Sequence, residues 1–412
     1  MTPTAAETAQ PLSSYHRWLF FFLGVAGFFE GYDTFAFTQL LPQIREEMGM
    51  SRSDAGLLIG FINIGGVLAY GLVRLADRWG RRRVLTITIL GYTACTLLTG
   101  LAPSAAAFGA AQLLARVFLV AEWAIATVYA AEEFSAERRG TVIGVIHGLN
   151  GFGAIACAGI APEILKTSLG WRGVYFIGAI PLLLMTIARR SLRETRRFES
   201  QAAPAGGASF WRILEAPFRS RMLLLALIWG LTYFCSTTAI TFWKEHAVAE
   251  RGLSDEGVRG HVAVAAVVAM PLAFGAGKLI DKVGRRLGAV VIYAMVVLGT
   301  LGSYSAPGKA LVIVSLILGM AGITAVGVVL GAYTAELFPT SLRADAFGWS
   351  NHLFGRLAPI IAPVVVGFGA ERIGWGRSVS LTALFPCAAL ALILLRLPET
   401  RGRELEETSG AR

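Results

Sequence analysis

The sequence predicts an all-α membrane protein with twelve transmembrane helices arranged as two pseudo-symmetric six-helix bundles. Three observations support this fold class. Of the 412 residues, 55% are hydrophobic and only 16% are charged, whereas about a quarter of the residues of a soluble domain are usually charged. Apolar runs of about twenty residues, each long enough to cross a bilayer as a helix, recur along the whole chain. The second half of the sequence also repeats landmarks of the first half.

The expected spans are joined by polar connections. Because a helix satisfies its own backbone hydrogen bonds, a helical bundle is the natural way for such runs to cross lipid. The polar first 17 residues contain no apolar core followed by a cleavage site, so we expect no removable signal peptide. The four cysteines fall inside spans and lack metal-ligand spacing, so we expect neither disulfides nor a metal site. The spans are expected at 18–41, 54–76, 84–102, 106–130, 141–162, 172–190, 222–243, 259–280, 288–305, 310–333, 346–369 and 378–397.

The basic residues indicate how the chain is oriented. With the N-terminus inside, 25 of the 37 Lys and Arg residues fall on the cytoplasmic side and 10 fall in outside loops. This is the positive-inside bias, which places both termini in the cytoplasm. We therefore expect a multi-pass protein of a bacterial plasma membrane. The net charge of +10 is then explained by topology, without a nucleic-acid partner.

An internal repeat divides the chain. The polar segment 191–220 is expected to be a cytoplasmic linker between an N-terminal bundle, 1–190, and a C-terminal bundle with a tail, 221–412. The sequence DRWGRR of the first half matches DKVGRR of the second half, and several other landmarks share the same offset of 204 residues. The pairs are Asp77 and Asp281, Arg81 and Arg285, Arg82 and Arg286, Glu132 and Glu336, Arg139 and Arg343, and Gly170-Trp171 and Gly374-Trp375.

Over essentially its full length the chain resembles the major facilitator superfamily. The family pattern after the second span, G-x-L-A-D-R-x-G-R-R/K, reads VRLADRWGRR and GKLIDKVGRR here, with Val73 in the place of the first glycine. The resemblance implies two bundles that rock around a central cavity and expose it to each side in turn. The arginines of the motif could alternatively serve only as a topology signal. The residues assigned to a cytoplasmic gate are Asp77, Arg81, Arg82, Asp281, Arg285, Glu132, Arg139, Glu336 and Arg343.

Four ionisable residues inside the spans are candidates for proton coupling, since charges in spans usually face the bundle interior or a wet cavity. Glu30 and Asp33 are three residues apart and share a helix face. Burial favours the neutral form of a carboxyl and a nearby arginine favours the charged form, so such a group can bind and release a proton. Asp33 is the preferred candidate, and the alternative is a structural carboxylate paired with Arg116. Arg116 matches the span-four arginine of proton-linked family members, and Glu122 resembles the glutamate of the Gly-Glu-Trp of metabolite and sialate symporters.

Arg356 is the main substrate clue. The segment ELFPTSLRADAFGWSNHLFGRLAP resembles spans ten to eleven of organic-ion and aromatic-acid transporters, in which anion carriers have arginine at this position. A guanidinium matches a carboxylate with two parallel hydrogen bonds. An arginine bonded to backbone or to a carboxylate of the protein is the alternative. Further candidates for the pocket, each of which could instead be a packing residue, are His352, Tyr32, Tyr233, Trp243, Asn150 and His147.

These features favour a transporter over an enzyme. No Walker loop, Ser-His-Asp order or metal-ligand cluster is present. We expect a monomeric, proton-coupled importer of a small organic anion, such as an aromatic acid or another carboxylate, with the proton as coupling ion and no cofactor. The alternatives are a drug or metabolite antiporter, a sugar:proton symporter, and a transport-derived sensor.

Overall fold

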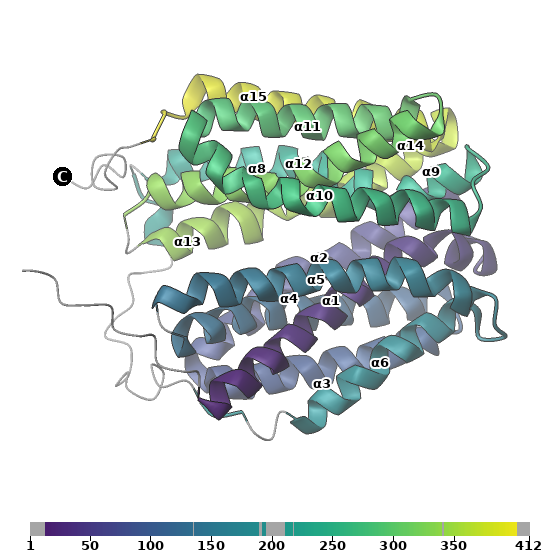
Figure 1. The fold of residues 1–412 in the computed structure, drawn as a ribbon, viewed down its shortest axis with the longest axis horizontal. Coiled ribbons are helices and arrows are strands. Elements are labelled where there is room, and N and C mark those ends of the chain that lie inside the picture. The colour runs from purple at the N-terminus through teal and green to yellow at the C-terminus, as the bar shows by residue number, and fades with distance from the viewer. Residues whose placement is uncertain are drawn as a thin grey trace, which may run out of the picture.

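The computed structural model describes residues 13–134, 136–188, 192–194, 211–216, 218–339 and 342–401. In these ranges the chain is built from helices, and no strand occurs there. Figure 1 shows the helices in two groups, with α1–α6 forming one half and α8–α15 forming the other.

The N-terminal half contains six long helices. They are α1 (Ser14–Glu47), α2 (Arg52–Trp79), α3 (Arg81–Gly100), α4 (Ala105–Glu133), α5 (Ala136–Leu165) and α6 (Gly170–Ala188). The C-terminal half contains additional short helices, and one of its segments, η4, is a π-helix. Its elements are η2 (Arg212–Leu214), α8 (Phe218–Thr241), α9 (Trp243–Ala249), α10 (Asp255–Val283), α11 (Arg285–Ser305), α12 (Lys309–Glu336), α13 (Arg343–Phe347), η4 (Gly348–Gly355), α14 (Leu357–Leu381) and α15 (Leu384–Arg396).

The twelve expected spans each correspond to helical structure. Nine helices of the described residues are long and apolar enough to cross a membrane, and α10 adds a tenth as a pair bent by 42°. One of the nine, Asp345–Arg396, is 52 residues long, more than twice the roughly twenty residues that a span needs. Gly374, with a φ of 81°, divides it into two. The remaining span is α6, and the short helix α9 connects the spans formed by α8 and α10.

The internal repeat is visible in the backbone at the start of α3 and α11. Gly80 and Gly284, 204 residues apart, precede these helices with φ values of 93° and 94°, a region that glycine adopts without steric cost. Neither helix has a side-chain cap from the preceding residue. Instead, the carboxylate of Glu194 accepts hydrogen bonds from the first two backbone N–H groups of α3, and that of Glu399 does the same for α11. The two halves therefore share a local design, as the sequence predicted.

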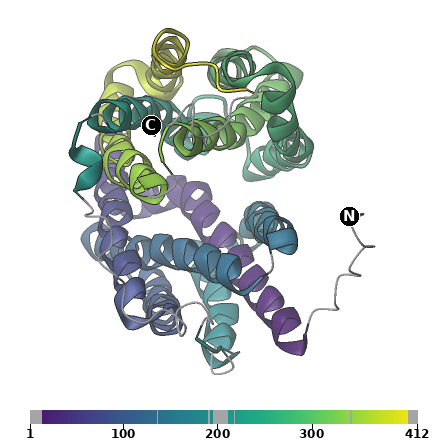
Figure 2. The ribbon, with the colours of Figure 1, turned by 90° about the vertical axis from the view of Figure 1, so that its left-hand side faces the viewer.

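The two halves meet mainly through α2 and α14, with further contacts of α5 with α10 and of α1 with α9. Glycines allow the close approach of α2 to α14. A Cβ atom added to Gly56 would lie 2.3 Å from the carbonyl oxygen of Pro363. We call the end of the bundle that carries Gly80 and Gly284 the motif end. Figure 2 views the molecule from this end.

Candidate functional site

Arg356 lies directly after the π-helix η4 and faces the other half of the molecule. A Cβ atom added to Gly66 in α2 would lie 3.0 Å from Nη1 of Arg356. The guanidinium of Arg356, which belongs to the C-terminal half, therefore packs against the backbone of α2 where glycine has no side chain. Its Nε is buried without a hydrogen-bond partner. Among the described residues Arg356 forms no ion pair with a carboxylate. The alternative of an arginine neutralised by a protein carboxylate therefore finds no support in the described part of the chain.

Glu30 of α1 and Arg116 of α4 lie close enough to Arg356 to interact with it electrostatically, and Glu122 of α4 lies near Glu30. Glu30 interacts electrostatically with Glu122, Arg116 and Arg356, and Arg116 interacts in turn with Arg356 and Glu30. None of these four side chains forms a hydrogen bond or an ion pair with another described residue. We call Glu30, Arg116, Glu122 and Arg356 the central charge group. It joins residues from both halves, and its charged atoms remain available to a proton or a ligand.

Asp33 has different surroundings from Glu30, although the spacing of the two residues places them on one face of α1. Its Oδ2 accepts hydrogen bonds from the hydroxyl of Tyr92 and from Oγ1 of Thr96 in α3, the latter at 3.2 Å. Its Oδ1 is buried without a partner. Asp33 therefore points into the N-terminal half, where it interacts with Arg116 electrostatically without forming the ion pair that a structural role beside Arg116 would require.

Between the halves lies a cavity of about 360 Å³. A second cavity of about 580 Å³ shares five lining residues with it. They are Phe35, Ala154, Val262, Met320 and Thr324. The lining comes from α1 and α5 on one side and from helices of the C-terminal half on the other. Two of the predicted pocket residues, Asn150 and Trp243, belong to it.

Other predicted pocket residues lie elsewhere. Tyr32 is buried, and its hydroxyl donates to the carbonyl oxygen of Val174 in α6 at 3.4 Å. It packs within the N-terminal half in this conformation, and its contact with substrate stays a prediction.

Tyr233 stacks on Trp229, with ring centroids 5.2 Å apart, and accepts a hydrogen bond from Nδ2 of Asn351 at 3.0 Å. His352 packs edge-on against Phe347 and interacts electrostatically with Arg356. Tyr233 likewise lies close enough to Arg356 to interact with it electrostatically.

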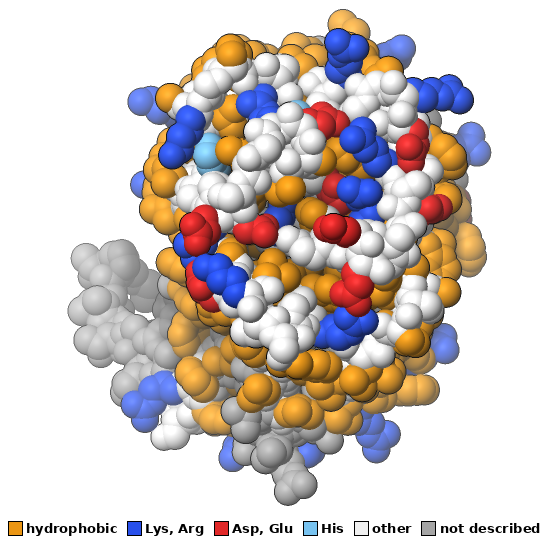
Figure 3. Space-filling view, turned by 90° about the vertical axis from the view of Figure 1, so that its right-hand side faces the viewer, with side chains coloured by type: hydrophobic (Ala, Val, Ile, Leu, Met, Phe, Trp, Pro, Cys, Tyr) orange, Lys and Arg blue, Asp and Glu red, His pale blue; other side chains and the backbone are white. Residues whose placement is uncertain are grey.

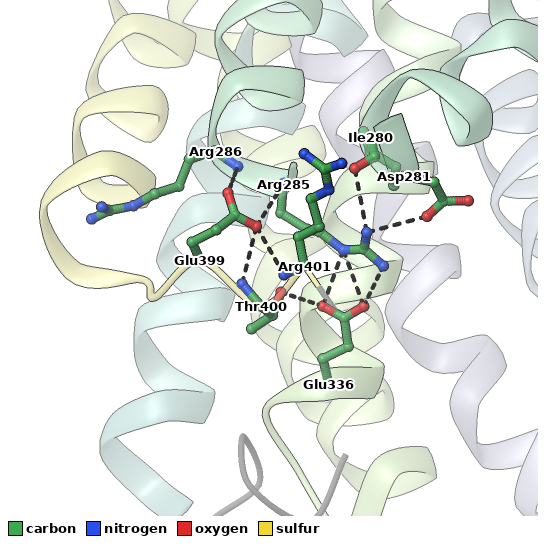
Figure 4. A network of polar contacts seen from close by, with 8 residues as sticks. All are labelled: Ile280, Asp281, Arg285, Arg286, Glu336, Glu399, Thr400 and Arg401. Atoms are coloured by element: carbon green, nitrogen blue, oxygen red, sulfur yellow. Dashed lines mark hydrogen bonds and ion pairs between the residues drawn. The ribbon is translucent and has the colours of Figure 1, made fainter. Parts of the chain in front are cut away.

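The predicted gate residues of the C-terminal half form a compact network at the motif end, shown in Figure 4. Arg285 donates to Asp281 at 3.1 Å and to Glu336 at 2.7 Å, and the hydroxyl of Thr400 donates to Glu336. Burial raises the pKa of Glu399, but hydrogen bonds from backbone N–H groups outweigh this effect and hold the pKa below its usual range. The network therefore fastens the C-terminal tail to α10, α11 and α12.

In the N-terminal half, Arg81 and Arg82 are held through their backbone N–H groups, and the guanidinium of Arg81 donates to the carbonyl oxygen of Ala76 at 3.1 Å. The contacts that are described for these arginines and for the network of Figure 4 stay within one half, so a gate between the halves at this end remains a prediction. The predicted site residues whose side chains lie outside the described part are Asp77, Glu132, Arg139, Arg343 and His147.

At the opposite end, four ion pairs join the two halves. Figure 3 views this end, where acidic and basic side chains gather near the middle of the face. The basic members of these pairs were expected only as outside loop charges that set topology, and no sequence motif marks the pairs. The pairs are Arg45–Glu245 at 3.0 Å, Arg52–Glu250 at 3.5 Å, Lys166–Glu256 at 3.2 Å and Arg259–Glu163 at 3.1 Å. We call these four pairs the cross-half closure.

Comparisons with known proteins agree with this architecture. Residues 23–363 match the model of the Major Facilitator Superfamily. The putative niacin/nicotinamide transporter NiaP of Bacillus subtilis is 27% identical over 93% of this chain and 97% of its own length. The cis,cis-muconate transport protein of Acinetobacter baylyi is 27% identical over 92% of this chain and 95% of its own length. The crystal structure of a D-xylose-proton symporter superposes with a TM-score of 0.76 at 18% identity, over 95% of this chain and all of the other.

Two helical halves around a shared cavity, with unpaired charges between them, define a multi-pass membrane transporter rather than an enzyme. The family match, which covers most of the chain, identifies the kind of transporter. The chain belongs to the Major Facilitator Superfamily and is a secondary transporter.

Proposed function

We propose that the protein takes up a small organic anion, such as an aromatic acid or another carboxylate, together with a proton. The observation that carries this proposal is Arg356. It lies at the boundary between the halves, its Nε is buried without a partner, and it has no partner carboxylate among the described residues. Arg356 is half-buried, so its unpaired guanidinium carries part of the cost of a buried charge without a partner, and the planar fork of a guanidinium matches a carboxylate. A transported carboxylate would supply the missing partner.

The cavity favours an anion with an apolar body. Its lining combines apolar side chains, such as Phe35, Val262 and Met320, with polar ones, such as Asn150 and Lys244, so it can pack an apolar body and also hold a charged group of the same ligand. The relatives named for niacin or nicotinamide and for cis,cis-muconate support a small, flat substrate of this kind. The xylose symporter supports the fold alone.

The proposed cycle uses the cross-half closure and the central charge group. If the positive-inside bias places the motif end in the cytoplasm, the cross-half closure lies on the outer side, and this conformation is closed to the outside. The anion would bind from outside at Arg356 and Arg116 while Asp33 is protonated. Closure of the outer end and opening of the motif end would then release both to the cytoplasm, in agreement with the alternating access of transporters built from repeats.

Uptake by purified protein in proteoliposomes tests the proposal. Under an inward proton gradient, the wild-type protein should accumulate radiolabelled benzoate, nicotinate or cis,cis-muconate. Arg356→Gln should lower uptake about tenfold or more, because a charge-assisted hydrogen bond is worth about 1.5–3 kcal/mol. Arg356→Lys should retain part of the activity, since it keeps the charge but loses the fork. Arg372→Gln, at an exposed position of α14, is the control. Preference for amphiphilic cations, or transport that Arg356→Gln leaves intact, would contradict the proposal.

A further inference from the structure

Lys244 is a buried lysine of the cavity lining, and no sequence motif predicted a role for it. It is the second residue of α9, and its side chain is only 3% exposed. Its Nζ donates to the carbonyl oxygen of Gln39 in α1 at 2.6 Å and pairs with Oδ1 of Asp255 at 2.6 Å. Lys244 therefore connects the C-terminal half to the N-terminal half just inside the cross-half closure.

The ammonium of Lys244 keeps capacity for a ligand. An ammonium has three donors, and the described contacts use two of them. Lys244 and Trp243 both line the 360 Å³ cavity. Trp243 is 4% exposed, and its Nε1 is buried without a hydrogen-bond partner. A buried N–H donor without a partner is destabilising unless a ligand or a water molecule accepts from it. Two adjacent residues thus offer donors at the same end of the cavity.

The two present partners of Lys244 differ in how easily they can be replaced. The side chain of Asp255 is 37% exposed and also accepts from Nε2 of Gln43 at 3.3 and 3.4 Å, so this carboxylate keeps water and a second protein donor as partners when it leaves Lys244. Lys244 is buried and cannot be hydrated in the same way, so it would need a replacement anion. Its other charged neighbour, Glu245, is already engaged by Arg45. A carboxylate in the cavity could therefore take the place of Asp255 beside Lys244.

We propose that Lys244 and Trp243 form a carboxylate subsite in the cavity, separate from Arg356, and that the ligand and Asp255 compete for the ammonium of Lys244. This inference rests on the proposed transport of organic anions and extends it to the entry of the substrate. Gln39 and Lys244 come from different halves, so opening this end would separate them and expose the lysine. The anion would bind first at this exposed ammonium, before it reaches the central charge group. The apolar lining beside the lysine would hold the body of the ligand.

Binding of paired ligands to the detergent-solubilised full-length protein tests the inference. The probes are benzoate and nicotinate, each compared with its neutral amide, benzamide or nicotinamide, by isothermal titration calorimetry. Lys244→Gln should weaken binding of the carboxylates about tenfold or more, since it removes a charge-assisted hydrogen bond. Trp243→Phe, which keeps an aromatic ring but loses the N–H donor, should weaken it a few-fold. Asp255→Asn removes the competing charge and should strengthen it. Binding of the amides should change little in any variant.

The possible outcomes separate the two proposals. If the wild-type protein binds no carboxylate, the proposed function and this inference both fail. If Arg356→Gln abolishes binding while Lys244→Gln, Trp243→Phe and Asp255→Asn bind like the wild type, only the subsite is refuted. A purely structural role of Lys244 predicts that carboxylates and amides lose affinity equally and that Asp255→Asn brings no gain. Should Lys244→Gln fail to fold, the opposite effects expected for Trp243→Phe and Asp255→Asn still decide the question.

Discussion

Replacing Arg45 with glutamine should open the cross-half closure. Nε of Arg45 donates to Oε1 of Glu245 at 3.0 Å, and the two side chains are 24% and 1% exposed. The other carboxylate oxygen of Glu245 is buried without a partner, so Arg45→Gln leaves a buried charge that lacks its ion pair. Breaking a fully buried pair costs about 3–5 kcal/mol, and an exposed pair contributes about 0–1 kcal/mol. Because Arg45 is partly exposed, we expect about 2 kcal/mol, roughly a thirty-fold shift toward the open state.

Cysteine accessibility measures this shift. Thr34 is exposed within the cavity lining, so Thr34→Cys, in a Cys387→Ser background that removes the exposed native thiol, reports access from the outside. A membrane-impermeant maleimide added to intact cells should label this cysteine about thirty times faster when Arg45→Gln is present.

Adding Glu245→Gln to the Arg45→Gln variant should return the labelling rate toward that of the parent protein, since a neutral buried pair no longer contains an unpaired charge. Labelling by Arg45→Gln within twofold of the parent would refute the reasoning. So would equal acceleration in the single and double variants, because the effect could not then arise from the unpaired carboxylate.

Three further predictions concern coupling, helix packing and pH. Asp33→Asn should abolish proton-driven accumulation but retain counterflow exchange in proteoliposomes; loss of both would indicate a structural role. Gly153→Ala should lower the melting temperature by several degrees, because the added Cβ would lie 1.8 Å from a carbonyl oxygen of α1, whereas Gly159→Ala, which meets nothing within 4 Å, should not. Burial lowers the pKa of His246, while for Glu250 hydrogen bonds from backbone N–H groups outweigh burial and hold the pKa below its usual range. Both groups bind protons more readily in the unfolded chain, so the stability that they contribute to the fold is complete above about pH 6.5. As the pH falls, the contribution of the histidine is lost first, and that of the glutamate is lost below about pH 4.3. A His246→Gln, Glu250→Gln variant should therefore lose less thermal stability than the wild type between pH 7 and pH 4.

The fold could be predicted almost completely from the sequence, because the apolar runs and the internal repeat can both be recognised in the sequence directly. The span boundaries follow from apolar runs that are stable in lipid as helices. The offset of 204 residues predicted that Gly80 and Gly284 would have the same role in the backbone, each before a helix. The observed φ values of 93° and 94° confirm this. The carboxylates of Glu194 and Glu399, one from each half, prove to be the caps of two corresponding helices.

The site was less predictable because it depends on how each helix is rotated. Spacing alone placed Glu30 and Asp33 on one face, but only the packing of α3 shows that Tyr92 and Thr96 surround Asp33. The exact end of a span also matters. Lys244 fell one residue outside the expected seventh span and was assigned to a loop, although it lines the cavity. Correct placement would have required the turn between α8 and α9, which hydropathy does not resolve.

The π-helix before Arg356 makes this region tolerant of one change in the length of the chain. A π-helix accommodates an additional residue within a helical segment, whereas in an α-helix each residue advances the chain by about 100° around the axis. Deletion of a single residue from Gly348–Gly355 should therefore restore an ordinary α-helix and leave the direction of Arg356 relative to α13 little changed. The same deletion within α13 should turn Arg356 by about 100°, away from Gly66, and should affect transport more severely.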